Sequence, residues 1–286
     1  MEAGAELRRW ASIAFPERDW GPAEHHHGAF HDVLVLPSEV ALRVPTGADA
    51  AVRAAREVEV VRAAQQVQLG VAVPEALSGV VHRDGASGYL VGAVPGAPAP
   101  PAAWTGLKDA FAELLAGLAS APGLQGLPPV RAWCGGERFP DVVARDLVPL
   151  LDEHAAAATQ AVSALLDLPA PRRVGLVHGD FGAHNLLWSG GRASALIDWD
   201  HACSGDPAAD VAPLVGAHGA SAVAEIVDDE VLHRAMVHRA TLPLQVAAAA
   251  HLAERWALRD HALGTFGRRS EEGTLSDPGG GGPVGS

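Results

Sequence analysis

The sequence predicts an α+β chain with two lobes, a small β-rich lobe followed by a larger, mainly helical one. Three observations predict this fold. Alternating and β-branched segments concentrate before residue 95, segments with helical periodicity dominate after it, and a proline-rich crossing over residues 94–101 separates the two. We place the N-lobe at residues 1–94 and the C-lobe at residues 95–272, and we expect a disordered, glycine-rich tail over residues 273–286.

The N-lobe elements follow from local patterns. Alternating and β-branched residues predict a strand pair that ends at Pro45, and a segment almost free of breakers after it predicts a long helix. The expected elements are a helix over residues 6–15, strands over 33–36 and 39–44, a helix over 48–69 and a strand over 89–91. The consecutive histidines 25–27 are expected in a flexible exposed loop, because three consecutive side chains cannot all converge on one metal ion.

In the C-lobe, a β-hairpin is expected between two groups of helices. Helical periodicity covers residues 107–119 and 152–168 and returns up to about residue 265. Between these helices, apolar runs over residues 186–188 and 193–197 flank a Ser-Gly-Gly turn. Two short apolar runs around such a turn are typical of a β-hairpin.

Asp180, Asn185 and Asp198 are the candidate catalytic group. A hairpin centred near Gly191 places Asn185 almost directly across from Asp198, and Asp180 lies in the loop before the hairpin. Mg²⁺ takes oxygen ligands from one or two protein groups and completes its shell with phosphate and water. Two such ligands, beside a free carboxylate that can accept the proton of an attacking hydroxyl, predict magnesium-dependent phosphoryl transfer.

Composition limits the classes of partner and location. The net charge of −13 argues against nucleic acid, whose phosphates require clustered Lys and Arg, and it favours a cationic small molecule. No apolar run is long enough for a membrane span, and the first residues lack the basic start and apolar core of a secretory leader, so we expect neither. The two cysteines do not make a disulfide framework. We therefore expect a cytoplasmic enzyme that is a monomer or a weak dimer.

Three motifs occur in order within the C-lobe. They are His178-Gly179-Asp180 with Asn185, then Ile197-Asp198-Trp199-Asp200, then Gly205-Asp206-Pro207 with Asp210. Together they resemble the aminoglycoside phosphotransferase family, relatives of the protein kinases, and the resemblance covers roughly residues 28–260. It implies a bilobal protein-kinase-like fold, ATP or GTP as phosphate donor, and Mg²⁺. It also implies Asp180 as the base and Asn185 and Asp198 as metal ligands, with His178, Asp206 and Asp210 bracing the loop.

The resemblance also implies a nucleotide site in the N-lobe. In the family a strand lysine contacts the phosphates and pairs with a helix glutamate. The only lysine here, Lys108, lies beyond the lobe boundary. An arginine, whose planar guanidinium can also bind phosphate or carboxylate, is therefore the candidate for the role of the strand lysine, with a helix glutamate as its partner. No G-x-G-x-x-G loop occurs, and a single-glycine loop takes its place. The expected nucleotide contacts are Arg43 with Glu57, the loop residues Gly28 and Phe30, the C=O of Gly92 and the N–H of Val94.

The acceptor that the resemblance implies is a hydroxyl of a cationic antibiotic, an aminoglycoside or a basic peptide. Chain length and the run Gly-Asp-Phe-Gly-Ala-His-Asn most resemble the viomycin and capreomycin phosphotransferase branch of the family, whose substrates are basic cyclic peptides. Such kinases confer antibiotic resistance. The candidate acceptor contacts are Asp200, His184, Glu225, Asp228, Asp229, Glu254 and Asp260.

Other functions stay open at this point. A macrolide kinase, or a metabolic kinase similar to choline, homoserine or fructosamine kinases, would carry the same motifs. A metal-dependent hydrolase could be built on His178, Asp180, His184 and Asp198. The missing strand lysine also leaves an inactive binding module open.

Overall fold

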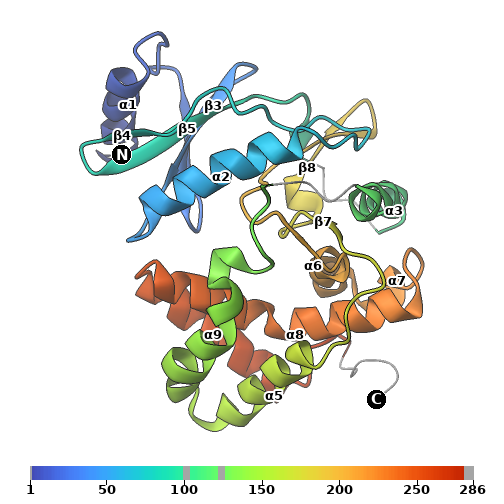
Figure 1. Cartoon of the computed structure of the whole chain (residues 1–286). Helices are drawn as coiled ribbons and strands as arrows, with labels where there is room; N and C mark the ends of the chain where they lie inside the picture. The colour runs from blue at the N-terminus through green and yellow to red at the C-terminus, as the bar shows by residue number, and fades with distance from the viewer. Residues whose placement is uncertain (1, 99–103, 122–125, 280–286) are drawn as a thin grey trace.

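The computed structural model describes residues 2–98, 104–121 and 126–279. A five-stranded sheet with helices α1 and α2 forms the N-terminal lobe, and helices dominate the larger lobe, which lies below it in Figure 1. This arrangement confirms the α+β bilobal fold expected from the sequence. Among the described residues, we find no helix that is both long and apolar enough to cross a membrane.

The N-lobe sheet is antiparallel and has the strand order β1-β2-β3-β5-β4. Its elements are α1 (Glu2–Ala14), β1 (Glu24–His27), β2 (His31–Leu36), β3 (Val40–Pro45), α2 (Ala50–Ala64), β4 (Val81–Arg83) and β5 (Ala86–Gly92). Strands β2 and β3 are the pair expected before Pro45. Trp10 of α1 packs with Leu34 and Leu42 on one side of the sheet, and α2 packs with Tyr89 of β5 in a second cluster.

The three consecutive histidines form strand β1, so the expectation of a flexible loop is wrong. His27 lies opposite Asp32 in the antiparallel pairing of β1 with β2. The rings of His25 and His27 both hydrogen-bond Oδ1 of Asp32, at 3.0 and 2.8 Å. Consecutive histidines lack the alternation of apolar and polar residues by which a strand is predicted from sequence. Here pairing with β2 and the shared carboxylate of Asp32 keep the segment extended.

Helix α2 ends at Ala64, five residues before the limit expected at Leu69. The chain leaves the helix through a turn in which the N–H groups of Gln66 and Val67 donate to carbonyls three residues earlier. This turn lets Leu69 pack against Gly117 of α3, between the lobes. Tertiary packing therefore overrides the helical periodicity of the last turn.

Two small sheets support the loops between the lobes. Strand β6 (Ala97–Pro98) pairs with β8 (Leu186–Ser189), and β8 pairs with β9 (Arg192–Leu196) as the expected hairpin. Strand β7 (Gly175–Val177) pairs with β10 (Cys203–Gly205). Part of the proline-rich crossing is thus the short strand β6, and residues 99–101 of that crossing lie outside the described residues.

The C-lobe is helical apart from these strands. Its helices are α3 (Trp104–Ser120), α4 (Phe139–Val142), α5 (Ala155–Leu166), α6 (Ala208–His218), α7 (Ala220–Val223), α8 (Asp229–Leu252) and α9 (Trp256–Glu271). Short 3-10 or π turns are η1 (Ala132–Cys134), η2 (Gly136–Arg138), η3 (Val143–Leu147), η4 (Val148–Leu150), η5 (Asp152–His154) and η6 (Ala183–Asn185). Helix α8 runs through the middle of the lobe (Figure 1). Leu244 of α8 packs there with Phe139 and Phe266 in a buried cluster.

The sequence predicts a disordered tail over residues 273–286, but its described part, residues 273–279, packs against the C-lobe. Nη1 of Arg239 donates to the backbone oxygen of Leu275 at 2.6 Å. Oδ1 of Asp277 accepts a hydrogen bond from the N–H of Ala220 at 3.0 Å. Residues 280–286, which include most of the glycine run, lie outside the described residues.

Candidate active site

Asp180, Asn185 and Asp198 meet at the open end of the β8–β9 hairpin. Nδ2 of Asn185 donates hydrogen bonds to the backbone oxygen of Asp180 at 2.8 Å and to its Oδ2 at 3.0 Å. The backbone oxygen of Asn185 accepts a hydrogen bond from the N–H of Ile197 at 2.9 Å. Ile197 therefore faces Asn185, and Asp198 is the next residue along the chain. The turn predicts Asp198 itself opposite Asn185, so the observed pairing differs by one position.

The backbone of this site adopts unusual conformations. Asp198 has a φ of +65°, in the left-handed region that residues other than glycine rarely adopt. Gly179 has a φ of +88°, and a Cβ atom there would lie 2.5 Å from the backbone oxygen of His201. Strain of this kind persists only where the surrounding structure imposes it, and it clusters at functional sites.

The loop that carries Asp180 is held by His178 and Asp210. The N–H groups of His178 and Gly179 donate to the carboxylate of Asp210 at 2.7 and 2.8 Å. Burial raises the pKa of Asp210 to about 7. Nε2 of the buried His178 donates to the backbone oxygen of Ile197, and its Nδ1 accepts from the N–H of Asp180. With both ring nitrogens engaged, His178 is not placed as a metal ligand, which argues against the hydrolase alternative.

Asp206 ties the segment after β10 to helix α8. Its Oδ2 accepts hydrogen bonds from Nη2 of Arg234 at 2.7 Å and from Nε2 of His238 at 2.9 Å. Burial raises the pKa of Asp206, but the hydrogen bonds from His238 and Arg234 outweigh burial and lower that pKa below the usual aspartate value. The sequence analysis missed both partners, because Arg234 and His238 follow Asp206 by 28 and 32 positions and no local pattern connects them to it.

His184 lies beside the candidate base. Its Nε2 is 3.3 Å from Oδ2 of Asp180, and both side chains are partly exposed to solvent. Burial alone would raise the pKa of Asp180, but the hydrogen bond and the charge of His184 lower it below the usual aspartate value. The same hydrogen bond raises the pKa of His184. Asp180 is therefore ionised at neutral pH, as a proton acceptor must be.

Arg43 of β3 reaches across to the C-lobe motif, and it does not pair with Glu57 as expected. Its Nη2 donates to Oδ1 of Asp198 at 2.8 Å and also to Oδ2 of Asp200. The carboxylates of Asp200 and Asp198 raise the pKa of Arg43 against the opposing effect of burial. Asp200 is 5% exposed, so it lies behind the site and not on a surface that an acceptor could reach.

Glu57 of α2 is bound by two residues that the sequence analysis missed. Its Oε2 accepts hydrogen bonds from Nε2 of His31 at 2.9 Å and from the hydroxyl of Tyr89 at 3.2 Å. Burial raises the pKa of Glu57, but the bond from His31 outweighs it and lowers that pKa overall. The strand register was the available signal, because Tyr89 lies directly opposite Arg43 in the β3–β5 pairing.

The other nucleotide candidates lie in the β1–β2 turn and after β5. The N–H of Gly28 donates to the backbone oxygen of His31 at 2.8 Å, which closes the turn. Phe30 is buried against the C-lobe, with the guanidinium of Arg53 5.2 Å from its ring centre. The N–H of Gly92 donates to the backbone oxygen of Glu75, and Val94 follows two residues later between the lobes.

The remaining acceptor candidates fall into two groups at opposite ends of α8. Glu225, Asp228 and Asp229 lie before and at its start, where Glu225 pairs with Lys108 and Asp228 accepts a hydrogen bond from the N–H of Val231. Glu254 and Asp260 lie beyond its end. Helix α8 has 24 residues, a length of about 36 Å. The structure therefore does not bring the two groups together around one small molecule.

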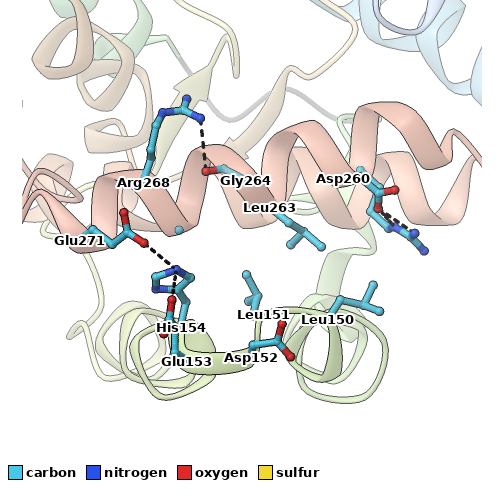
Figure 2. A pocket seen from close by; sticks show the side chains of 12 residues that line it. Leu150, Leu151, Asp152, Glu153, His154, Asp260, Leu263, Gly264, Arg268 and Glu271 are labelled. Carbon is cyan, nitrogen blue, oxygen red and sulfur yellow. Dashed lines mark hydrogen bonds and ion pairs between the residues drawn. The ribbon is translucent and has the colours of Figure 1, made fainter.

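A cavity of about 570 Å³ separates η4 and η5 from α9 (Figure 2). Figure 2 shows His154 between Glu153 and Glu271 at one end and Asp260 at the other. Nε2 of His154 is 3.4 Å from Oε1 of Glu271. The lining includes no residue of the loop and hairpin over residues 178–200. Of the acceptor candidates only Asp260 borders this cavity, which is separate from the catalytic loop.

The sequence matches the phosphotransferase enzyme family over residues 30–248. The viomycin phosphotransferase of Streptomyces vinaceus is 29% identical over 246 residues, which span 78% of this chain and 84% of that protein. The hygromycin-B 4-O-kinase of Escherichia coli is 42% identical over 67 residues, which span 22% of this chain and 19% of that protein.

Solved structures of this kind share the fold. The GDP complex of wild-type aminoglycoside 2′-phosphotransferase-IIIa superposes with a TM-score of 0.72 at 16% identity, over 95% of this chain and 99% of that chain. A thermostable mutant of aminoglycoside phosphotransferase APH(4)-Ia, bound to AMP-PNP and hygromycin B, superposes with a TM-score of 0.63 at 19% identity, over 94% of this chain and 99% of that chain. The match over residues 30–248 confirms the resemblance seen in the motifs: the chain belongs to the phosphotransferase enzyme family and is a small-molecule O-phosphotransferase.

Proposed function

We propose that this enzyme transfers the γ-phosphoryl group of ATP or GTP to a hydroxyl of a cationic antibiotic and so confers resistance to it. The observation that carries the proposal is the union of Asp180, Asn185 and Asp198 at one end of the hairpin. Asp180 is ionised and its side chain is 44% exposed, so it can accept the proton of an incoming hydroxyl. Phosphoryl transfer needs such a carboxylate beside oxygen ligands for a cation.

The residues of the site fit Mg²⁺. Asn185 uses its Nδ2 for Asp180, and no described residue donates to its Oδ1, which is left for a cation. Asp198 already holds a cationic group, the guanidinium of Arg43. Hard oxygen atoms of this kind are the ligands that Mg²⁺ prefers. When bound, the ion would neutralise the negative charge of the donor phosphates.

The proposed nucleotide position is the junction of the lobes. The turn at Gly28 would cover the phosphates, Arg43 would contact them, and the backbone of Gly92 and Val94 would bind the base, whereas Phe30 is buried against the C-lobe and is not proposed as a contact. The solved relatives that contain GDP or AMP-PNP support a nucleotide donor in this fold.

The cationic acceptor is supported by charge and by the named relatives. The chain carries a net charge of −13, and viomycin phosphotransferase matches most of its length. The exposed carboxylates at the two ends of α8 offer alternative positions for the acceptor. Charge-neutralising variants of each group, Asp228→Asn with Asp229→Asn against Glu254→Gln with Asp260→Asn, would identify the end that contributes to the acceptor KM.

The direct test is phosphate transfer from γ-labelled ATP with Mg²⁺ to a panel of acceptors. The panel holds viomycin, capreomycin, kanamycin, hygromycin B, a macrolide and choline, and Asp180→Asn serves as the inactive control. We expect a phosphorylated product from one of the cationic antibiotics, identified by mass spectrometry. Transfer to choline alone or to the macrolide alone would show that the acceptor is not a cationic antibiotic, while the assignment as a kinase would stand.

A further inference from the structure

We propose that Asp200 is the positioning residue that holds Arg43 for the nucleotide. It takes the part expected of a glutamate on helix α2. The inference rests on the proposed function, because it concerns how the arginine assigned to the phosphates is kept in place. Arg43 touches two carboxylates with the same nitrogen, and the two differ in burial.

The exposure of the two carboxylates separates their roles. The side chain of Asp198 is 40% exposed, whereas that of Asp200 is 6% exposed. Asp198 can exchange Arg43 for another cation at the surface of the site. Asp200 cannot do so, because a buried carboxylate without its cationic partner is strongly unfavourable.

Two other polar side chains lie near Asp200, at longer distances. The hydroxyl of Tyr89 donates to its Oδ1 at 3.4 Å, and Nε2 of His31 is 3.4 Å from its Oδ2. His31 and Tyr89 are the same residues that hold Glu57. Their distances to Glu57, 2.9 and 3.2 Å, are shorter than those to Asp200, so these two donors serve mainly Glu57, and Arg43 is the main cationic partner of Asp200.

Arg43 keeps donors for a ligand while it is anchored. Both of its carboxylate contacts use Nη2. Among the described residues, its buried Nε has no hydrogen-bond partner. A guanidinium can bind two oxygens of one phosphate in parallel. Because the two carboxylates use only Nη2, we assign the contact with a phosphate to the other nitrogens of the guanidinium.

Anchoring by Asp200 also limits competition at Asp198. Without Asp200, Asp198 would be the only carboxylate bound to Arg43, and the guanidinium would compete there with the cation that accompanies ATP. Asp200→Asn should therefore raise both the Kd for a nucleotide and the Mg²⁺ concentration needed for half-maximal binding.

The experiment is calorimetric titration of AMP-PNP with Mg²⁺ into the wild type, Asp200→Asn, Arg43→Gln and the double variant. We expect Asp200→Asn to raise the Kd about 10- to 100-fold, by analogy with the losses seen when the hydrogen-bond partner of a metal ligand is removed. In the double variant, Asp200→Asn should add nothing to the effect of Arg43→Gln, because the two act as one unit. Glu57→Gln should raise the Kd much less than Asp200→Asn does.

Several results would overturn the role of Asp200. They are an unchanged Kd in Asp200→Asn, additive losses in the double variant, or a loss in Glu57→Gln as large as that in Asp200→Asn. Melting curves report folding, and the double variant removes the buried pair together, which spares the fold an unpaired charge. Failure of the proposed function is a different result, since the wild type would then bind neither AMP-PNP nor the GTP analogue GMP-PNP.

Discussion

The side-chain nitrogen of Asn185 donates to Oδ2 of Asp180 at 3.0 Å, so the amide and the carboxylate form one unit. The same nitrogen also holds the backbone oxygen of Asp180. Two bonds from one amide fix both the carboxylate and the loop that carries it. Asn185 therefore orients the candidate base, and in the proposed function its own oxygen would also serve the cation.

Asp180→Asn should reduce kcat strongly while leaving the Kd for MgATP nearly unchanged. An amide cannot accept the proton of the acceptor hydroxyl, and general-base catalysis contributes about 10²–10⁴-fold. The carboxylate is assigned to the acceptor and not to the nucleotide, so binding in the ground state is preserved. Steady-state kinetics and calorimetry on the same preparation measure both quantities. Wild-type turnover in this variant would refute the base assignment.

Asp198→Ala should abolish activity and weaken MgATP binding more than Asn185→Ala does. A carboxylate supplies charge to a cation site, whereas a neutral amide supplies only an oxygen. Raising the Mg²⁺ concentration should restore little activity to Asp198→Ala, because a direct ligand is missing. Titration of MgATP into both variants measures the difference. Equal affinities for MgATP in the wild type and Asp198→Ala would contradict the assignment of Asp198.

Gly179→Ala should destabilise the fold more than Gly190→Ala. Both glycines have a positive φ, +88° and +57°, which costs alanine roughly 1–2 kcal/mol. Only at Gly179 would the new Cβ also collide, at 2.5 Å from the backbone oxygen of His201, whereas nothing lies within 4 Å at Gly190. Urea unfolding measures the loss in free energy of unfolding for each variant. The difference between the two losses reports the collision, because the backbone strain is common to both. Equal losses in stability would show that the loop relaxes freely.

Asp206→Asn should lower the free energy of unfolding at pH 7 but have little effect in acid. The carboxylate is buried with Arg234 and His238, and breaking such a pair costs roughly 3–5 kcal/mol. Its pKa is lowered by folding, so its contribution is fully present above the unfolded value of about 3.9 and is lost gradually as the pH falls from that value through the lower pKa of the folded state.

Urea titrations of wild type and Asp206→Asn at pH 7 and below pH 4 would measure that trend. The difference between the two proteins should shrink as the pH falls. A difference that stays constant over this range would show that the ionised form of Asp206 contributes nothing to the pair with Arg234 and His238.

The KM for a cationic acceptor should rise with salt. Exposed charges are screened over about 8–10 Å at physiological ionic strength, so attraction by the acidic chain weakens as salt is added. The KM for ATP should follow another trend, because ATP is anionic. Kinetics at low and high potassium chloride measure both constants. An acceptor KM that does not change with salt would favour a neutral substrate.

Local patterns were sufficient for the hairpin and the order of the motifs. A Gly-Gly turn between two apolar runs restricts the chain to few conformations, so the positions of Asn185 and Asp198 follow from spacing. Strand β1 was missed, because its histidines show no apolar alternation and become extended only by pairing with β2. The ends of α2 and the contacts of Asp206 were missed for a related reason, since distant residues decide both.

The sequence by itself determined the family, the two-lobed fold and the candidates Asp180, Asn185 and Asp198, because these depend on residue type and short spacing. Only the tertiary structure decided the partners of Arg43 and Glu57. Those pairs join residues 157 and 26 positions apart in the chain. A sequence does not show which acidic residue pairs with which basic residue. The pairing depends on which buried donors and acceptors the packed lobes bring within hydrogen-bonding distance.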